Sequence, residues 1–227
     1  MSELKVMIGL RRWDDVPQKD MHSAWENVHA PALAAAAKPL RYAVTTFEGR
    51  EGRTPPAYDG IEELWFRDRA HYEASMAAGW DSPADASFQA MLDPNRCFRL
   101  LTTELISVND APVARENEKV VLFVRRLETV GPKHFFDEWR DNHSHNVANG
   151  FKGKDGASRY VVTLADENGE RGAFDGFPVF WWRDAAARTA PADSATSGSG
   201  TAVEDHFDDL CALGTLRLIG HEFYVVR

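Results

Sequence analysis

The 227-residue sequence contains only two cysteines, Cys97 and Cys211, which lie far apart in the chain. A disulfide framework is therefore not expected. No run of about 18 apolar residues occurs that could cross a membrane, and the first residues have neither the basic nor the apolar part of a secretory signal. These absences lead us to expect a cytoplasmic protein without membrane contact.

Motifs of several common enzyme classes are also missing. The sequence has no Gly-rich dinucleotide or phosphate loop and no G-x-S-x-G element, which removes the usual basis for predicting a nucleotide cofactor or serine hydrolysis. Basic residues are outnumbered, since 26 Lys and Arg face 35 Asp and Glu, for a formal net charge of -9. This charge disfavours nucleic acid as a partner. Acid–base chemistry is the class that stays open.

What the sequence does have is an internal repeat, in which ordered blocks recur with small changes of spacing. The matched blocks are Lys5–Arg12 with Lys119–Arg126, Trp25 and His29 with Trp139 and His143, Arg41–Thr45 with Arg159–Thr163, Asp59–Asp68 with Asp175–Asp184, and Arg99–Glu104 with Arg217–Glu222. Repeats of this kind decide the fold. We expect a first repeat over residues 1–110, a linker over residues 111–117 and a second repeat over residues 118–227.

Each repeat predicts the element order β-α-β-β-α-β, which is the ferredoxin-like motif. Strands are expected over Lys5–Arg12, Arg41–Phe47, Glu62–Arg67 and Arg99–Val108, and over Lys119–Arg126, Arg159–Leu164, Val179–Arg183 and Arg217–Val226. Helices are expected over Val16–Ala30, Arg69–Ala78, Ala84–Leu92, Thr129–Ala148 and Ala202–Leu213, with a mobile loop over Thr189–Gly200.

The fold class predicted from these elements is α+β. A sheet covered by helices on one face must bury its other face, and the second repeat is the available partner. We therefore expect two ferredoxin-like βαββαβ repeats that form a pseudo-dimeric α+β barrel. As a fused pseudo-dimer the chain would be a monomer, although a homodimer stays open.

The motif Trp25-Glu-Asn-Val-His29, repeated as Trp139-Arg-Asp-Asn-His143, resembles the signature of the EthD family. The chain is thus similar to a tandem EthD-type protein of the dimeric α+β barrel superfamily. That resemblance implies the fold and a relation to cofactor-free polyketide cyclases, monooxygenases and some haem-binding proteins.

Histidines on the first helix are the candidate catalytic residues. His22, Trp25 and His29 are spaced to share one helix face, and the equivalent stripe of the second repeat carries Trp139 and His143. A His on an apolar, sheet-facing stripe either lines a pocket as a general acid or base or is a core residue bonded to a polar group of the sheet. The sequence leaves both interpretations open.

Aromatic and basic residues of the strands are the candidates for substrate binding, and simple core packing or a salt bridge is the alternative for each. With Trp25 and Trp139 they comprise Tyr42, Trp65, Tyr160, Trp181, Arg12 and Arg126. No metal site is expected, because His143 and His145 point apart on a helix and His22 and His29 are two turns apart.

The leading hypothesis is a cofactor-independent enzyme for a small aromatic or polyketide-like substrate, which acts by cyclisation, dehydration, lyase chemistry or oxygenation. One alternative is a haem-binding or haem-degrading protein, because a single His suffices as a proximal ligand. Another is a non-catalytic protein that binds a small hydrophobic molecule. Only one of the two repeats is expected to hold a working pocket.

Overall fold

The computed structural model describes residues 3–49, 55–77, 86–109, 113–166, 172–189, 209–212 and 216–227. The chain divides into two compact units, the first comprising Met1–Thr103 with Gly220–Arg227 and the second Glu104–Ile219. The fold is α+β, and its strands pair in the closed antiparallel barrel order β1-β3-β2-β8-β5-β7-β6-β4. Strands β4 (Phe98–Asn109) and β8 (Leu216–Val226) each begin in one unit and end in the other.

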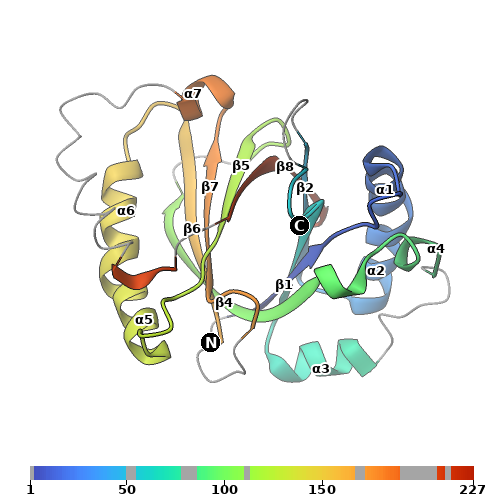
Figure 1. Ribbon diagram of the computed structural model, residues 1–227, viewed down its shortest axis with the longest axis horizontal. Coiled ribbons are helices and arrows are strands. Elements are labelled where there is room, and N and C mark those ends of the chain that lie inside the picture. The colour runs from blue at the N-terminus through green and yellow to red at the C-terminus, as the bar shows by residue number, and fades with distance from the viewer. Residues whose placement is uncertain are drawn as a thin grey trace. The chain divides into compact units, whose positions relative to one another are not determined.

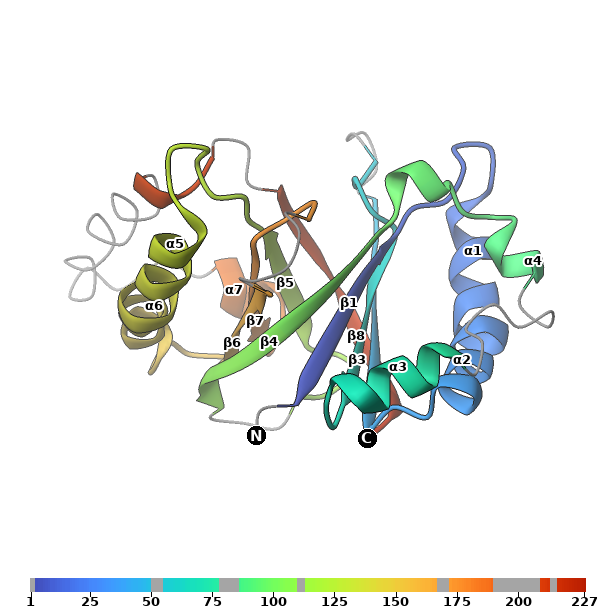
Figure 2. The same cartoon turned by 90° about the horizontal axis from the view of Figure 1, so that it is seen from below.

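The first unit has a sheet with helices along one face (Figures 1 and 2). Its strands, besides the parts of β4 and β8, are β1 (Leu4–Leu10), β2 (Arg41–Phe47) and β3 (Gly60–Phe66), and its helical segments are α1 (Gln18–Ala24), η1 (Trp25–His29), α2 (Ala30–Ala37), α3 (Arg69–Ala77), α4 (Ala86–Gln89) and η3 (Pro94–Arg96). Strand β1 is central, as its continuous apolar run predicts, because it pairs with both β3 and β4.

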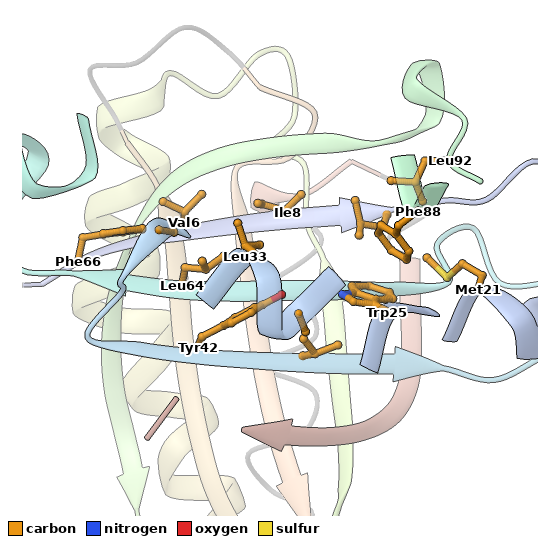
Figure 3. Close-up of a cluster of buried hydrophobic side chains, with 14 residues drawn as sticks. Val6, Ile8, Met21, Trp25, Leu33, Tyr42, Leu64, Phe66, Phe88 and Leu92 are labelled. Atoms are coloured by element: carbon orange, nitrogen blue, oxygen red, sulfur yellow. The ribbon is translucent and has the colours of Figure 1, made fainter. Parts of the chain in front are cut away.

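Alternation along these strands separates two buried faces. The helix-facing side chains of β1 and β3, among them Val6, Ile8 and Leu64, join Met21 and Leu33 of the helices in one core cluster (Figure 3). On the opposite face, Lys5 and Glu63 form a fully buried ion pair at 2.7 Å. Successive side chains of a strand point to opposite faces, so the carboxylates of Glu62 and Glu63 lie on different sides of the sheet. Both are buried, as is every residue of β3.

The first helix differs from its prediction because it continues beyond Ala30 to Ala37, past Pro31. Proline inside a helix normally breaks it, since the ring removes a backbone donor. Here a π-helical segment, η1, precedes Pro31, and the N–H of Ala30 bonds to the carbonyl of Trp25 in the widened pattern. The second unit has a π-helical segment at the matched position with His145 in place of Pro31, so proline is not its cause.

The second unit repeats the element order of the first, with β5 (Glu118–Phe123), α5 (Pro132–Glu138), η4 (Trp139–His143), α6 (Ser144–Phe151), β6 (Ala157–Ala165), β7 (Gly176–Trp182) and α7 (Ala185–Thr189). The loop expected from Thr189 to Gly200 lies outside the described residues after Thr189, as does most of the helix expected over Ala202–Leu213. In the described part of the chain, no helix is long and apolar enough to cross a membrane.

Candidate functional site

The centre of the candidate site is the carboxylate of Glu62, a residue that is only 1% exposed. Its Oε1 atom accepts hydrogen bonds from the indole Nε1 of Trp25 at 2.7 Å and from the hydroxyl of Tyr42 at 2.5 Å. The Nε2 atom of His29 lies 3.0 Å from the same oxygen. Because a carboxylate oxygen only accepts, Nε2 is the protonated nitrogen of this imidazole. Three donors therefore converge on one buried oxygen.

Local structure explains this convergence. Trp25 and His29 are the first and last residues of η1, and both side chains are buried on the sheet side of that segment. Tyr42 lies on β2 diagonally opposite Glu62, whose direct partner across the strands is Val44. Figure 3 shows the hydroxyl of Tyr42 and the indole nitrogen of Trp25 pointing toward one another. One helical segment and two strands thus supply the four side chains.

The His29 ring is held from its other side by an aromatic residue of α4. Phe88 is fully buried and stacks on His29, with ring centroids 4.3 Å apart and planes 18° from parallel. The stack fixes the orientation of the imidazole, and so the direction of its bond to Glu62.

A cavity of about 340 Å³ opens beside Glu62 and His29, within the first unit. This volume is at the small end of the range for ligand pockets, which suits a compact ligand. Most of its wall is apolar, with a few polar groups at defined places. The lining residues are Ile8, Leu10, Leu33, Leu92, Pro94 and Phe98 with His29, Glu62, Gln89, Cys97 and Arg99. Burial raises the pKa of the Cys97 thiol, which disfavours its reactive thiolate form.

The second oxygen of Glu62 has a different environment. Within the described residues no hydrogen bond reaches Oε2, and this atom is not among the side-chain oxygens that are fully buried without a partner. Since Glu62 lines the cavity, Oε2 is the carboxylate atom that a bound ligand can meet. The carboxylate is therefore fixed through one oxygen and accessible through the other.

Other predicted residues of the first unit lie away from this cluster. The backbone N–H of Arg12 donates to Asp59 at 2.9 Å, and its Nε is 3.2 Å from the same carboxylate. The Nε2 atom of His22 lies 3.0 Å from the Asp59 carbonyl oxygen, and burial lowers the pKa of this imidazole. Trp65 faces the opposite side of the sheet, where the ammonium of Lys5 lies over its ring. None of these three predicted residues is among the described residues that line the cavity.

The second unit has counterparts of Trp25, His29 and Tyr42, which form a matched aromatic frame, but it lacks a counterpart of the Glu62 carboxylate. Trp139, His143 and Tyr160 are buried at matched positions, with the Trp139 and His143 rings 4.4 Å apart. The residue matched to Glu62 is Pro178, which pairs with Val162 as Glu62 pairs with Val44. Among the described residues, the buried hydroxyl of Tyr160 has no hydrogen-bond partner, and burial raises the pKa of this phenol.

The two remaining predicted residues of the second unit have partners similar to those of the first. Arg126 donates from its backbone N–H to Asp175 at 2.9 Å, and its guanidinium pairs with the same carboxylate. Trp181 lies under the ammonium of Lys119, as Trp65 does under that of Lys5. The matched aspartates anchor the ends of β1 and β5 in the same way.

Sequence reasoning missed Glu62. Its signal is a charged pair, Glu62-Glu63, inside a strand of otherwise apolar residues, where a carboxylate must find buried donors. Glu62 is not shared between the matched blocks, because its counterpart is Pro178.

A haem group can be tested against these residues. The Nε2 atom of His29 already bonds Glu62, and Phe88 covers one face of the imidazole. The cavity of about 340 Å³ suits a ligand of a few rings better than a tetrapyrrole. These residues do not fit a haem ligand set. Among the described residues there is also no group of three His, Cys, Asp or Glu side chains placed to hold a metal ion.

Residues 14–82, which include Trp25, His29, Tyr42 and Glu62, match the EthD domain family. No curated protein matches the chain. An anthrone oxidase-like protein superposes with a TM-score of 0.69 at 14% identity, covering 100% of this chain and 95% of its own. A proposed monooxygenase from Lactobacillus acidophilus gives 0.58 at 7% identity, covering 100% and 97%.

A mutant chlorite dismutase from Candidatus Nitrospira defluvii is also similar, with a TM-score of 0.55 at 9% identity over 97% of this chain and 92% of its own. Identities this low show a shared fold. They leave the reaction to be argued from the site.

Proposed function

We propose that the first unit is a cofactor-independent enzyme site that removes a proton from a small aromatic or polyketide-like substrate. The observation that carries this proposal is the buried carboxylate of Glu62, fixed by three donors on Oε1 and accessible to the cavity through Oε2. Abstraction of an acidic proton by a positioned base is a step that can begin cyclisation, dehydration, lyase chemistry or cofactor-independent oxygenation. The names of the anthrone oxidase-like and monooxygenase relatives support this class of substrate.

In this mechanism Glu62 is the general base. Oε2 accepts the proton of an acidic C–H or phenolic O–H group, and the electron pair stays on the substrate as an enolate or phenolate. Glu62 and its three donors are buried, which strengthens the electrostatic interactions among them. The carbanion or phenolate then eliminates, cyclises or reacts with molecular oxygen, according to the substrate.

Trp25 and Tyr42 position the base without reacting, and His29 helps to position it. Their three hydrogen bonds prevent rotation of the carboxylate, which keeps Oε2 aimed at the cavity. His29 also lines the cavity, so its imidazolium can supply a proton to an oxygen of the intermediate. The catalytic pair is therefore Glu62 as base and His29 as its partner and acid.

We also propose that the chain is a tandem pair of ferredoxin-like repeats that together form a pseudo-dimeric barrel. The shared element order, the matched π-helical segments η1 and η4, and the matched aspartates Asp59 and Asp175 support this origin. Under this proposal the second repeat lost its base when Pro178 took the place of the carboxylate.

Deuterium exchange into anthrone tests the proton abstraction directly. Anthrone carries an acidic CH₂ group between two rings, and NMR in D₂O follows the loss of its proton signal without any oxidant. The wild type should accelerate exchange. Glu62→Gln should remove at least about 100-fold of that acceleration, because general-base catalysis contributes about 10²–10⁴-fold.

The matched control is His143→Gln, which alters the equivalent histidine of the second unit and should leave exchange unchanged. His29→Gln should lower the rate and flatten its pH profile. Exchange at the uncatalysed rate, with anthrone bound, would support the non-catalytic binding alternative and refute the proposal. Equal rates in wild type and Glu62→Gln would refute the role of this carboxylate.

A further inference from the structure

The cavity contains a cation at a defined separation from the proposed base. Ile8 of β1 is the direct partner of Glu62 on β3 and also of Arg99 on β4. The three residues therefore form one row across adjacent strands. Neighbouring strands are about 4.8 Å apart, so the backbones of Glu62 and Arg99 are separated by roughly 10 Å.

Both ends of this row face the helices. Leu101 is two residues from Arg99 and packs against the core cluster that contains Ile8, which places Arg99 on the same face by alternation. Arg99 and Glu62 both line the cavity. The cation thus stands at one end of a largely apolar wall and the carboxylate at the other.

Arg99 carries the only permanent positive charge among the described residues that line the cavity. Arg11 and Arg12 pair with the buried carboxylate of Asp59, and Arg96 pairs with Asp14. Arg99 is exposed, and its guanidinium contacts the sulfur of Met76 at 3.9 Å. A guanidinium carries five donors in a planar fork, so it can bind a carboxylate through some of them while others keep their present partners.

We propose that Arg99 is a specificity residue that binds an anionic oxygen group, a carboxylate or phenolate, on an aromatic substrate whose acidic position lies at Glu62. The proposal deepens the proposed function, on which it rests for the role of Glu62. A separation of roughly 10 Å between the two backbones, shortened by both side chains, fits a substrate of two or three fused rings. Because the protein's net charge of -9 disfavours an anionic ligand, a cation in the cavity wall assists its binding.

Binding of two isosteric probes tests this assignment without turnover. We would measure dissociation constants of 2-naphthoate, which is anionic, and 2-naphthamide, which is neutral, by isothermal titration calorimetry. The wild type should prefer 2-naphthoate. Arg99→Met should weaken 2-naphthoate about tenfold or more, as expected for the loss of a charge-assisted hydrogen bond, and leave 2-naphthamide within about twofold.

Arg96→Met is the matched control, because it removes a nearby exposed cation that pairs with Asp14. It should change neither constant. The proposal is overturned if the wild type shows no preference, if Arg99→Met weakens both probes equally, or if Arg96→Met causes the same selective loss.

Glu62→Gln separates this proposal from the proposed function. It should abolish anthrone exchange while 2-naphthoate still binds with its Arg99 dependence. Selective binding in a wild type that never accelerates exchange would refute the catalytic role and leave the Arg99 subsite standing. If the wild type accelerates exchange but Arg99→Met does not selectively weaken 2-naphthoate, the Arg99 subsite is refuted and the catalytic role of Glu62 stands.

Discussion

Removal of the hydroxyl group from two tyrosines at matched positions should change the stability of the protein in opposite directions. Tyr42 and Tyr160 are both fully buried on equivalent strands. The hydroxyl of Tyr42 donates to Glu62 at 2.5 Å, whereas that of Tyr160 has no partner among the described residues. Replacing each by phenylalanine removes the hydroxyl and preserves the ring. The two variants thus compare a charge-assisted hydrogen bond with a buried, unsatisfied hydroxyl.

The expected magnitudes follow from these partners. A hydrogen bond to a charged group contributes about 1.5–3 kcal/mol, and Glu62 keeps two other donors, so Tyr42→Phe should cost about 2 kcal/mol. A buried hydroxyl without a partner costs about 1–3 kcal/mol, so Tyr160→Phe should stabilise the protein by about 1 kcal/mol. The two variants should therefore differ by about 3 kcal/mol.

Urea unfolding monitored by tryptophan fluorescence measures both changes. With a slope of about 2 kcal/mol per molar urea, Tyr42→Phe should lower the midpoint by about 1 M and Tyr160→Phe should raise it by about 0.5 M. In a Glu62→Gln background the cost of Tyr42→Phe should shrink, because the acceptor has lost its charge. A destabilisation by Tyr160→Phe as large as that by Tyr42→Phe would refute the argument.

Three other outcomes are expected. Burial lowers the pKa of His22 below 6.5, so this imidazole binds a proton more readily in the unfolded chain than in the folded protein. The stability should therefore fall as the pH drops from about 7.5 to about 5. Urea midpoints measured across this pH range should show a smaller fall in His22→Gln. Haemin titration should give no Soret band that depends on His29, since Nε2 of this residue is bonded to Glu62; a band lost in His29→Ala would contradict this. Pro178→Glu should give the Tyr160 hydroxyl an acceptor, which a mutant cycle can detect.

The strands were predictable because their apolar runs and repeats are local signals. The second strand was expected over Arg41–Phe47 and β2 spans those residues, while β4 and β8 each differ from expectation by one residue at their ends. The first helix was expected to end at Ala30, whereas it continues past Pro31 to Ala37. The π-helical segment before Pro31 departs locally from the α-helical period, so a search for α-helical spacing does not reveal it.

The candidate site was only partly predictable, for a related reason. Trp25, Tyr42 and His29 were selected as apolar-face or matched residues, and the structure brings them together. The acceptor that unites them is a long-range partner on another strand, and no sequence period identifies it. Arg99 was not among the predicted site residues, yet its register with Ile8 places it on the cavity wall.

A mutant cycle on the second unit tests whether one residue accounts for the difference between the two units. Val162 faces Pro178 as Val44 faces Glu62, so Pro178→Glu should place a carboxylate near the Tyr160 hydroxyl. In that background Tyr160→Phe should change from stabilising by about 1 kcal/mol to destabilising by about 2 kcal/mol. The cycle isolates this coupling whatever the carboxylate itself costs to bury. If Tyr160→Phe has the same effect in both backgrounds, the second unit has diverged in more than its base, and the matched frame is not a latent copy of the site.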